Sequence, residues 1–504
     1  MKSAYRLIAL ALVAIMMIGA FAACAETADP GADTTAPAAT EGAGNDVVAE
    51  TTESLYDDNG YLKSSLPDEL DFGGETVTVL WWNDVERPEF YVEEQNGEMI
   101  NDAIYQRNVN VEEKMGVTLA WVDIKGQYNN GVGKAYSDHV GNVYASGDQT
   151  YDIMSAHTRT IALTAKNGYC ADMMELDYLD FEKPWWPTVM LDTATIGESL
   201  YFVTGDVSTN SIHHMYAIFY NKDILSRYPE LVEPSASVLE GNWTVEAIQV
   251  LTKGLYQDLD GSNGANENDF YGFTSLSWHF DAVYYAAGLK QAEPDPDLIM
   301  KISPDYFSEK ADTLVSIVGE WVKQGDVYIN STYYDDVFVN GNSLMVMARH
   351  KDVAEQIVDA GFSYGIVPIP KYNTDQERHI TCVGNPCSLY SIFVNSADTN
   401  RAAAVLECWA SEAYRTTTPA VFETTMKLRY SETSVESQMY DIIRAGIVFD
   451  FGRLFNGDLG NMSDQWDNAA IAGTPWASIA KRMQKQLDKQ FKAIIDSFIA
   501  LENN

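Results

Sequence analysis

Residues 75–158 decide the fold, because they alternate strand-like and helix-like runs. They begin with ETVTVLWW (75–82), continue through an amphipathic stretch to GVTLAWV (116–122), and end, after a second such stretch, with YDIMSAHT (151–158). This strand–helix–strand–helix–strand order predicts a parallel sheet with helices packed on its faces. Ligands of such sheets lie beyond the carboxyl ends of the strands. We therefore expect a ligand crevice where these three strands end.

The residues at those strand ends combine aromatic rings with hydrogen-bonding groups. They are Trp81, Trp82 and Asp84 after the first strand, and His157, Thr158 and Arg159 after the third. Aromatic faces stack on the C–H faces of sugars, while carboxylate, imidazole and guanidinium groups bond hydroxyls. The pattern indicates a polyhydroxylated ligand, although for any single residue a packing role is an equal alternative.

The later chain continues the α/β pattern and adds candidates of the same kind. Strand-like runs recur at 215–220, 342–350, 365–371 and 387–394, and apolar residues at helical spacing mark a last helix over 479–498. Aromatic and polar residues at predicted strand ends and turns extend the candidate site: Asp206, Trp278, His279, Phe280, Arg349, His350 and Trp476. For Trp185 and Trp186, which follow a proline, we expect packing.

Charge and length limit the function classes. The 504 residues suit two or three domains, and 33 basic against 73 acidic residues give a formal net charge of −40. An acidic excess of this size repels a phosphate backbone, so no nucleic-acid partner is expected.

The N-terminus predicts export and membrane anchoring. Lys2 and Arg6 precede an apolar run that ends in Phe-Ala-Ala-Cys, with the cysteine at position 24. The segment 1–23 is typical of a signal peptide, and small residues before Cys24 resemble a bacterial lipobox, with Phe21 in place of the usual leucine. Secretion with unmodified Cys24 is the alternative. Residues 24–69 read as a lipidated cysteine, a disordered tether and a lead-in.

No catalytic or metal-binding motif occurs in the sequence with the spacing or the predicted secondary structure that it needs. The string GFSYG (361–365) matches G-x-S-x-G but precedes a predicted strand instead of following one, so no catalytic residue is predicted. No resident cofactor is expected. The acidic segment Asp258–Asp269 fails the EF-hand pattern, which leaves a non-EF structural calcium site as an alternative to a solvated loop. Cys382 and Cys387 are compatible with a disulfide or with two small buried residues.

Several stretches, taken in order, resemble one family. They are GVTLAWV (116–122), YDIMSAHTRTIALTAKNGYCADM (151–173), MYAIFYNKDIL (215–225), FVNGNSLMVMARH (338–350) and YGIVPIPKYN (364–373). Together they resemble family 1 extracellular solute-binding proteins, the maltose-binding-protein-like partners of ABC importers. FEKPWW (181–186) and GNWT (241–244) are similar to a subgroup common in Gram-positive bacteria.

The resemblance implies a two-lobed periplasmic-binding-protein-like fold whose chain crosses the hinge several times. It implies one lobe from 70–212 plus 362–411 and another from 213–361 plus 412–504. A carbohydrate, expected to be an oligosaccharide, would bind in the interlobe cleft of a monomer. The lipid-anchored receptor on the outer face of the cytoplasmic membrane would deliver it to the permease subunits without chemistry.

The family's sugar contacts fall here on 157–159, Trp278, Phe280, 349–350 and Trp476. Because Arg349 and His350 stand where a tryptophan would stack, maltodextrin itself is not expected. Three alternatives stay open: a surface glycan-degrading enzyme, a binding lobe for a sensor kinase, and a binder of a peptide or polyamine.

Overall fold

The computed structural model describes residues 54–502, apart from 58, 263, 359–360, 430 and 432. The chain divides into the units Met1–Ser54 and Leu55–Asn504. The predicted signal peptide, Cys24 and nearly all of the tether lie outside the described residues. Among the helices that are described, none combines the length and the apolar run that a membrane span needs.

The first sheet contains the strands predicted from residues 75–158. Its order is β12-β3-β1-β2, with the bounds β1 Glu75–Trp82, β2 Val117–Ile124, β3 Ile153–His157 and β12 Ser388–Ile392. Strand β1 pairs in parallel with β2 and β3, whereas β12 runs antiparallel to β3. The predicted strand–helix–strand–helix–strand order is confirmed. Gly116 ends the first helix in the left-handed conformation (φ 58°), which glycine adopts without steric cost.

The second sheet has the order β10-β4-β9-β5-β8. The bounds are β4 Tyr216–Asn221, β5 Tyr271–Ser275, β8 Val327–Ile329, β9 Ser343–Arg349 and β10 Tyr364–Val367. Strand β5 pairs in parallel with β8 and β9, and β4 runs antiparallel to β9 and β10. The expected lobe boundary at 362 needs correction for β10, because its backbone hydrogen bonds go to β4, with Ile366 opposite Phe219.

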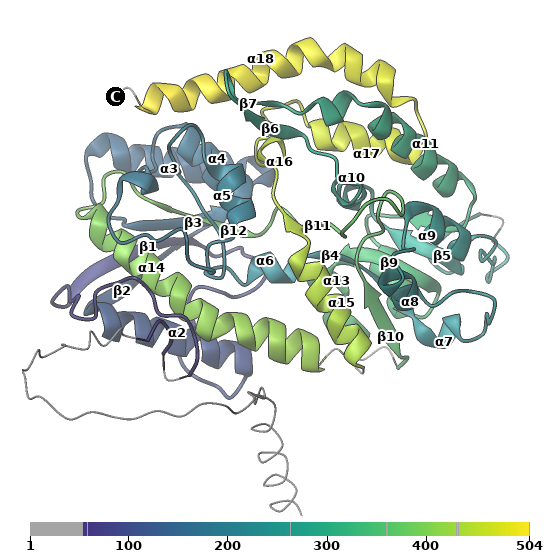
Figure 1. The fold of residues 1–504 in the computed structure, drawn as a ribbon, viewed down its shortest axis with the longest axis horizontal. Helices are drawn as coiled ribbons and strands as arrows, with labels where there is room; N and C mark the ends of the chain where they lie inside the picture. The colour runs from purple at the N-terminus through teal and green to yellow at the C-terminus, as the bar shows by residue number, and fades with distance from the viewer. Residues whose placement is uncertain are drawn as a thin grey trace, which may run out of the picture. The chain divides into compact units, whose positions relative to one another are not determined.

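Helices pack around both sheets, as Figure 1 shows. Those beside the first sheet are α2 Met99–Met115, α3 Val132–Ser146, α4 Thr158–Lys166 and α14 Thr399–Arg415. Around the second sheet and the C-terminal part lie α7 Lys222–Leu225, α8 Pro234–Leu239, α9 Val245–Thr252, α10 Asp281–Ala286, α11 Glu309–Lys323, α12 Tyr334–Val339, α13 His350–Val358, α15 Ser434–Ala445, α17 Met462–Ala472 and α18 Trp476–Glu502.

Several segments connect the two sheets. The chain leaves the first sheet through α5 Thr188–Ala194 and α6 Asn210–His213 and returns to it between β10 and β12. On the way back it forms β11 Thr381–Cys382, which pairs in parallel with β13 Ile447–Val448. Strand β13 is followed by α16 Phe451–Leu454. A second two-stranded ribbon joins β6 Ala292–Asp295 to β7 Ile299–Ile302. A wide π-helix spans Pro419–Arg429, before α15.

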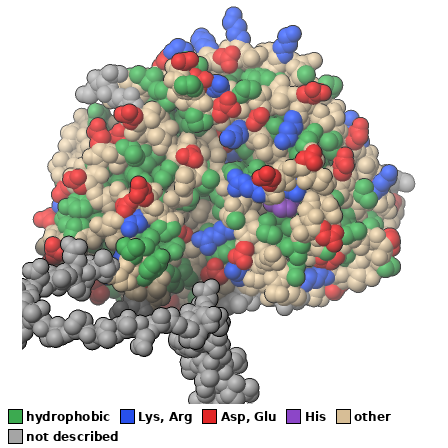
Figure 2. Space-filling model, viewed as in Figure 1, with side chains coloured by type: hydrophobic (Ala, Val, Ile, Leu, Met, Phe, Trp, Pro, Cys, Tyr) green, Lys and Arg blue, Asp and Glu red, His purple; other side chains and the backbone are tan. Residues whose placement is uncertain are grey.

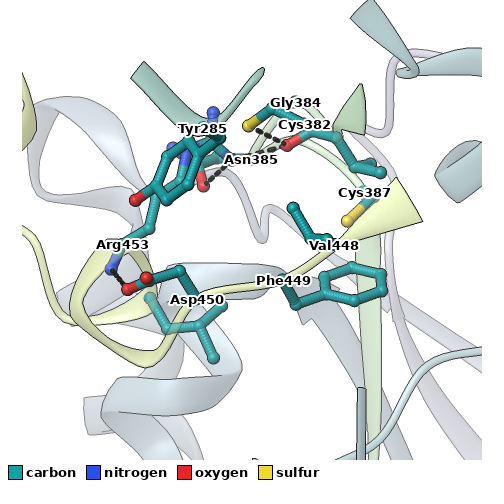
Figure 3. Close-up of a pocket in the computed structure, with 11 residues that line it drawn as sticks. Tyr285, Cys382, Gly384, Asn385, Cys387, Val448, Phe449, Asp450 and Arg453 are labelled. Carbon is teal, nitrogen blue, oxygen red and sulfur yellow. Dashed lines mark hydrogen bonds between the residues drawn. The ribbon is translucent and has the colours of Figure 1, made fainter. Parts of the chain in front are cut away.

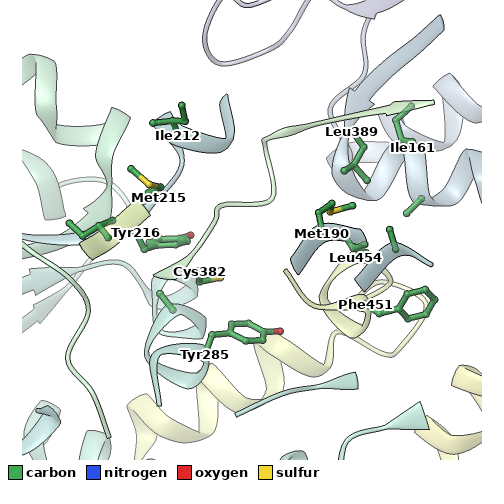
Figure 4. Packing of buried hydrophobic residues seen from close by; sticks show 14 of the residues in the cluster. Ile161, Met190, Ile212, Met215, Tyr216, Tyr285, Cys382, Leu389, Phe451 and Leu454 are labelled. Carbon is green, nitrogen blue, oxygen red and sulfur yellow. The ribbon is translucent and has the colours of Figure 1, made fainter. Parts of the chain in front are cut away.

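Buried apolar side chains continue through these connections. Figure 4 shows Met215, Tyr216 and Cys382 near one another in the connections between the sheets, with Met190 and Leu454 farther along. Cys170, Cys382, Cys387 and Cys408 are buried free thiols.

The expected packing role of Trp185 and Trp186 is confirmed. Both side chains are buried. Their indole N–H groups donate to the two carboxylate oxygens of Glu407, at 2.9 and 2.7 Å.

Candidate functional site

A cavity of about 510 Å³ lies between the carboxyl end of the first sheet and the second sheet. Its walls come from four parts of the chain: Glu86, Gln127, Tyr128, Asn129, His157 and Arg159 from the first sheet's loops; Tyr216, Trp278, Asp281 and Arg349 from the second; Asn385 and Pro386 from a connection; and Arg453, Asn461, Ser463, Asp464 and Asp467 from the C-terminal segment. We call this cavity the cleft. Its size suits a small organic ligand.

Arg453 organises the deep end of the cleft. It lies on the short helix α16, whose N-terminus is capped by Asp450. Its Nε and Nη2 donate to Asp281 Oδ2 at 2.9 and 2.7 Å, and its Nη1 donates to Asn385 Oδ1 at 2.9 Å. Figure 3 shows Arg453 and Asn385 from the side of a smaller pocket behind the cleft. A paired, buried guanidinium holds its neighbours in fixed positions.

Three polar atoms of this region are buried without a hydrogen-bond partner among the described residues. They are Asp281 Oδ1, Asp467 Oδ1 and Arg159 Nε. Burial, together with the charges of Asp281 and Asp464, raises the pKa of Asp467 well above its usual range. Unpaired buried polar atoms are rare in folded proteins and cost free energy. A ligand that both donates and accepts hydrogen bonds would satisfy them.

A second charged group stands at the mouth of the cleft. Glu86, in the loop after β1, accepts from Lys351 at 2.6 Å, from Arg349 at 3.2 Å and from His214 at 3.3 Å. Burial alone would raise the pKa of Glu86, but the hydrogen bond from His214 and the positive charges of Arg349 and Lys351 hold it well below its usual range. One carboxylate of the first sheet's loops is thus bound to the connection before β4 and to the end of β9. Gly384 is needed beside it, because a Cβ there would lie 2.6 Å from Arg349 Cδ.

Aromatic rings complete the walls. Trp278 is 50% exposed, the highest exposure of any tryptophan among the described large hydrophobic residues. The Tyr128 ring stacks on His157 with centroids 6.0 Å apart, and the Arg159 guanidinium lies 5.7 Å from its centroid. An exposed indole beside orphaned polar groups suits the stacking and hydrogen bonding that sugars require.

Comparison with known proteins bears on the fold. No family model matches the sequence, and no curated protein matches it. A cyclo/maltodextrin-binding protein complexed with maltotetraose matches with a TM-score of 0.54 at 12% identity, over 83% of this chain and 98% of that one. The chain has the two-lobed fold of solute-binding proteins.

Two further structures agree with that assignment. The cyclic alpha-maltosyl-1,6-maltose binding protein from Arthrobacter globiformis matches with a TM-score of 0.53 at 14% identity, over 83% of this chain and all of that one (100%). A family 1 extracellular solute-binding protein from Bifidobacterium longum subsp. infantis matches with a TM-score of 0.52 at 15% identity, over 83% and 99%. The predicted resemblance is therefore confirmed at the level of the fold, and the cleft is its interlobe cavity.

The structure brings four of the predicted site residues to the cleft. They are His157, Arg159, Trp278 and Arg349. His157 is buried, and its Nδ1 accepts from the Arg159 N–H at 3.1 Å. Arg349 is held by Asp352 through two bonds of 2.8 and 2.9 Å. Their binding roles stay predictions.

The other predicted aromatic residues pack within the protein. Trp82 is buried and donates to Ser388 Oγ at 3.0 Å, and Trp476 is buried and donates to the Tyr306 carbonyl at 2.7 Å. Phe280 is fully buried, and Trp81 packs against Phe90. We predict from sequence that Trp81 and Trp476 face a ligand, and neither lines the cleft in this structure.

The remaining predicted polar residues already have protein partners. Asp84 accepts from the Gly126 N–H at 2.7 Å, and Thr158 donates to the Asn385 carbonyl at 2.8 Å. These two bonds hold loops of the cleft in place. Asp206 accepts from Thr418 at 2.8 Å and does not line the cleft. His279 bonds the Met347 carbonyl at 3.1 Å and His350 the Tyr440 hydroxyl at 3.2 Å.

The strongest polar features of the cleft were missed from sequence. Glu86, Asp281, Arg453, Asp464 and Asp467 stand in no motif. Asp281 directly follows the predicted Trp278–Phe280 stretch, and this adjacency is the feature of the sequence that could have indicated its place in the cleft. The C-terminal residues come from α16 and α17, which enter the cleft only through tertiary packing.

The acidic loop predicted to be solvated or to bind calcium forms a compact group. One carboxylate oxygen each of Asp258, Asp260 and Asp269 lies within 4.8 Å of the others. Asp269 already accepts from Tyr256, Leu259 and Asn266. Carboxylate oxygens are the ligands that calcium prefers, so both alternatives stand.

Proposed function

We propose that the protein is a substrate-binding receptor that captures a carbohydrate in the cleft and delivers it to an ABC transporter permease. The observation that carries the proposal is a set of buried polar atoms without a described partner, Asp281 Oδ1, Asp467 Oδ1 and Arg159 Nε, on residues that line the cleft beside the exposed Trp278. Hydroxyl groups donate and accept, so a sugar satisfies carboxylate and guanidinium together. Closing the lobes around it would exclude water.

The solved structures with this fold support the ligand class. Two of them are named for binding cyclo/maltodextrin and cyclic alpha-maltosyl-1,6-maltose. The cleft proposed here is more charged than an aromatic sugar groove, with Arg349 held between Asp352 and Glu86. We therefore propose a sugar other than a maltodextrin, bound mainly through hydrogen bonds.

Membrane attachment is part of the same proposal. The predicted signal peptide, the lipobox-like sequence before Cys24 and the Ala- and Thr-rich tether support a lipid-anchored protein on the outer face of the cytoplasmic membrane. A tether of about 30 residues has a root-mean-square span of about 30 Å, which keeps the cleft within reach of a permease.

Binding and its location are tested together by calorimetric titration of the purified protein with a panel of sugars, oligosaccharides, peptides and polyamines. We expect one sugar class to bind and to be recovered unchanged. Asp467→Asn should weaken that sugar at least about tenfold, because it replaces a carboxyl oxygen with an amide nitrogen that only donates, while leaving unfolding nearly unaffected. Asp312→Asn on α11, outside the cleft, is the matched control. Binding of peptides or polyamines alone, or turnover of the sugar, would contradict the proposal.

A further inference from the structure

Helix α18 carries a row of basic side chains on its solvent face. Within its 27 residues, Lys481, Lys485, Lys489 and Lys492 follow one another at spacings of four, four and three, which places them on one side of a helix. Arg482 lies next to the first of them. All five are exposed. We call these five residues the basic stripe.

The opposite face of α18 anchors the helix in the protein. Leu487, Phe491, Ile494 and Phe498 are buried, and Phe498 packs against Tyr201 and Phe455. The apolar row and the basic stripe thus occupy opposite sides of one helix. The stripe is held rigidly, and its side chains are free to meet a partner.

The stripe contrasts in charge with the rest of the chain. Helix α18 holds five basic and three acidic residues, whereas the remainder of the chain holds 28 basic and 70 acidic residues. In Figure 2, Lys and Arg side chains project from the edge along which Figure 1 draws α18. Cations are scarce in this protein, and this helix collects them on one surface.

Most of the stripe is not used inside the protein. Lys492 pairs with Asp496 at 2.5 Å, and Asp297, Asp488 and Asp496 gather around that end of the helix. By contrast, Lys481, Arg482, Lys485 and Lys489 form no ion pair with any described residue. The free positive charge therefore lies on the first half of α18.

We propose that the basic stripe docks the folded unit on an anionic phospholipid surface. The stripe lies on the exposed side of a helix about 40 Å long, a form that fits an extended, uniformly charged surface better than a concave pocket. Phosphate oxygens accept from several ammonium and guanidinium groups at once. The predicted lipid anchor on Cys24 would keep such a surface within reach, and one acyl chain plus a basic patch binds a membrane more firmly than either alone.

The acidic remainder of the protein does not prevent this contact. Charges interact over a Debye length of about 8 Å at physiological ionic strength, so lipid phosphates in contact with α18 are affected mainly by the stripe. Docking through α18 would also fix which face of the receptor turns to the membrane. Sugar binding in the cleft is independent of this contact.

The test is cosedimentation with vesicles. The mature chain from residue 24 onward, carrying Cys24→Ser so that no lipid is attached, is mixed with vesicles of phosphatidylglycerol and phosphatidylcholine (about 1:1) or of phosphatidylcholine alone at physiological salt. We expect binding only to the phosphatidylglycerol vesicles. The combined substitution K481Q, R482Q, K485Q and K489Q should weaken it about 100-fold or more, since each basic residue near an anionic surface contributes measurably.

A matched variant separates the stripe from total charge. This control variant combines the substitutions K125Q, K134Q, K253Q and K290Q, so it loses the same number of exposed basic residues elsewhere. Its vesicle binding should stay unchanged. Thermal unfolding confirms that both variants are folded. No binding to phosphatidylglycerol by the parent chain, or equal losses in the two variants, would overturn the proposal. Binding to poly-glutamate but not to vesicles would also overturn it and indicate an acidic protein partner.

Discussion

Two buried carboxylate clusters, one around Glu407 and one around Asp281, differ in how completely they are satisfied. Glu407 accepts from the indoles of Trp185 and Trp186 and from the Asp180 N–H. Asp281 uses one oxygen for Arg453 and leaves the other, like Asp467 Oδ1, without a partner among the described residues. Both clusters are buried and both contain charge.

The difference separates a structural cluster from a binding cluster. Burial and an altered pKa occur in both, so neither property identifies a site. What distinguishes the cleft is hydrogen-bonding capacity left over after folding, on residues that line a cavity. Among the described residues, Trp185, Trp186 and Glu407 have no buried polar side-chain atom left without a partner. In a sequence, however, paired tryptophans suggest sugar stacking.

Arg453→Met should have the largest effect on stability. It leaves Asp281 buried without its ion pair, and removing one member of such a pair costs about 3–5 kcal/mol. Urea unfolding measures the loss, with the exposed Arg378→Met as the control expected within about 0.5 kcal/mol. A loss below about 1 kcal/mol would show that Arg453 does not stabilise the cleft.

Trp186→Phe should have an intermediate effect that is confined to stability. It removes the donor 2.7 Å from Glu407 Oε2, and a hydrogen bond to a charged group contributes about 1.5–3 kcal/mol. Sugar affinity in calorimetry should stay unchanged, because the residue is outside the cleft. A selective fall in affinity would break the distinction between the two clusters.

The pH dependence of stability should reveal Glu407. Burial raises its pKa to about 7, above the ordinary value of 4.5. The folded state then binds the extra proton between pH 4.5 and 7, so this stabilising contribution is complete below pH 4.5 and is lost as pH rises through 7. Glu407→Gln should flatten the curve in that window by up to about 3 kcal/mol. An unchanged slope would contradict the assignment.

Trp278→Ala should have the smallest effect and only on binding. The side chain is half exposed, so unfolding should shift by less than about 0.5 kcal/mol. Loss of stacking should weaken the sugar by about two- to tenfold. Trp476→Ala is the contrasting variant, since its buried indole should cost stability instead.

The sequence predicted the fold well because local periodicity carries it. The run 75–158 predicted the strands β1, β2 and β3 with helices between them, and β1 does pair in parallel with both β2 and β3. The lobe boundary at 362 failed for β10, because strand pairing with β4 is a long-range contact that no local pattern encodes.

The cleft was only partly predictable. His157 and Arg159 follow from the rule that ligands lie at the carboxyl ends of strands, and they do line the cleft. The same rule also selected Trp82, whose side chain points into the core instead, because successive strand residues alternate between faces. Arg453 and Asp467 reach the cleft from the C-terminal segment, which requires the tertiary structure.

The central claim is tested most directly by a crystal structure of the protein grown with the sugar that titration identifies. We predict the sugar in the cleft, with hydroxyls within hydrogen-bond distance of Asp281 Oδ1 and Asp467 Oδ1 and a ring face against Trp278. A sugar bound elsewhere, or bound in the cleft with those two oxygens still unpaired, would contradict the claim that orphaned polar atoms mark the site.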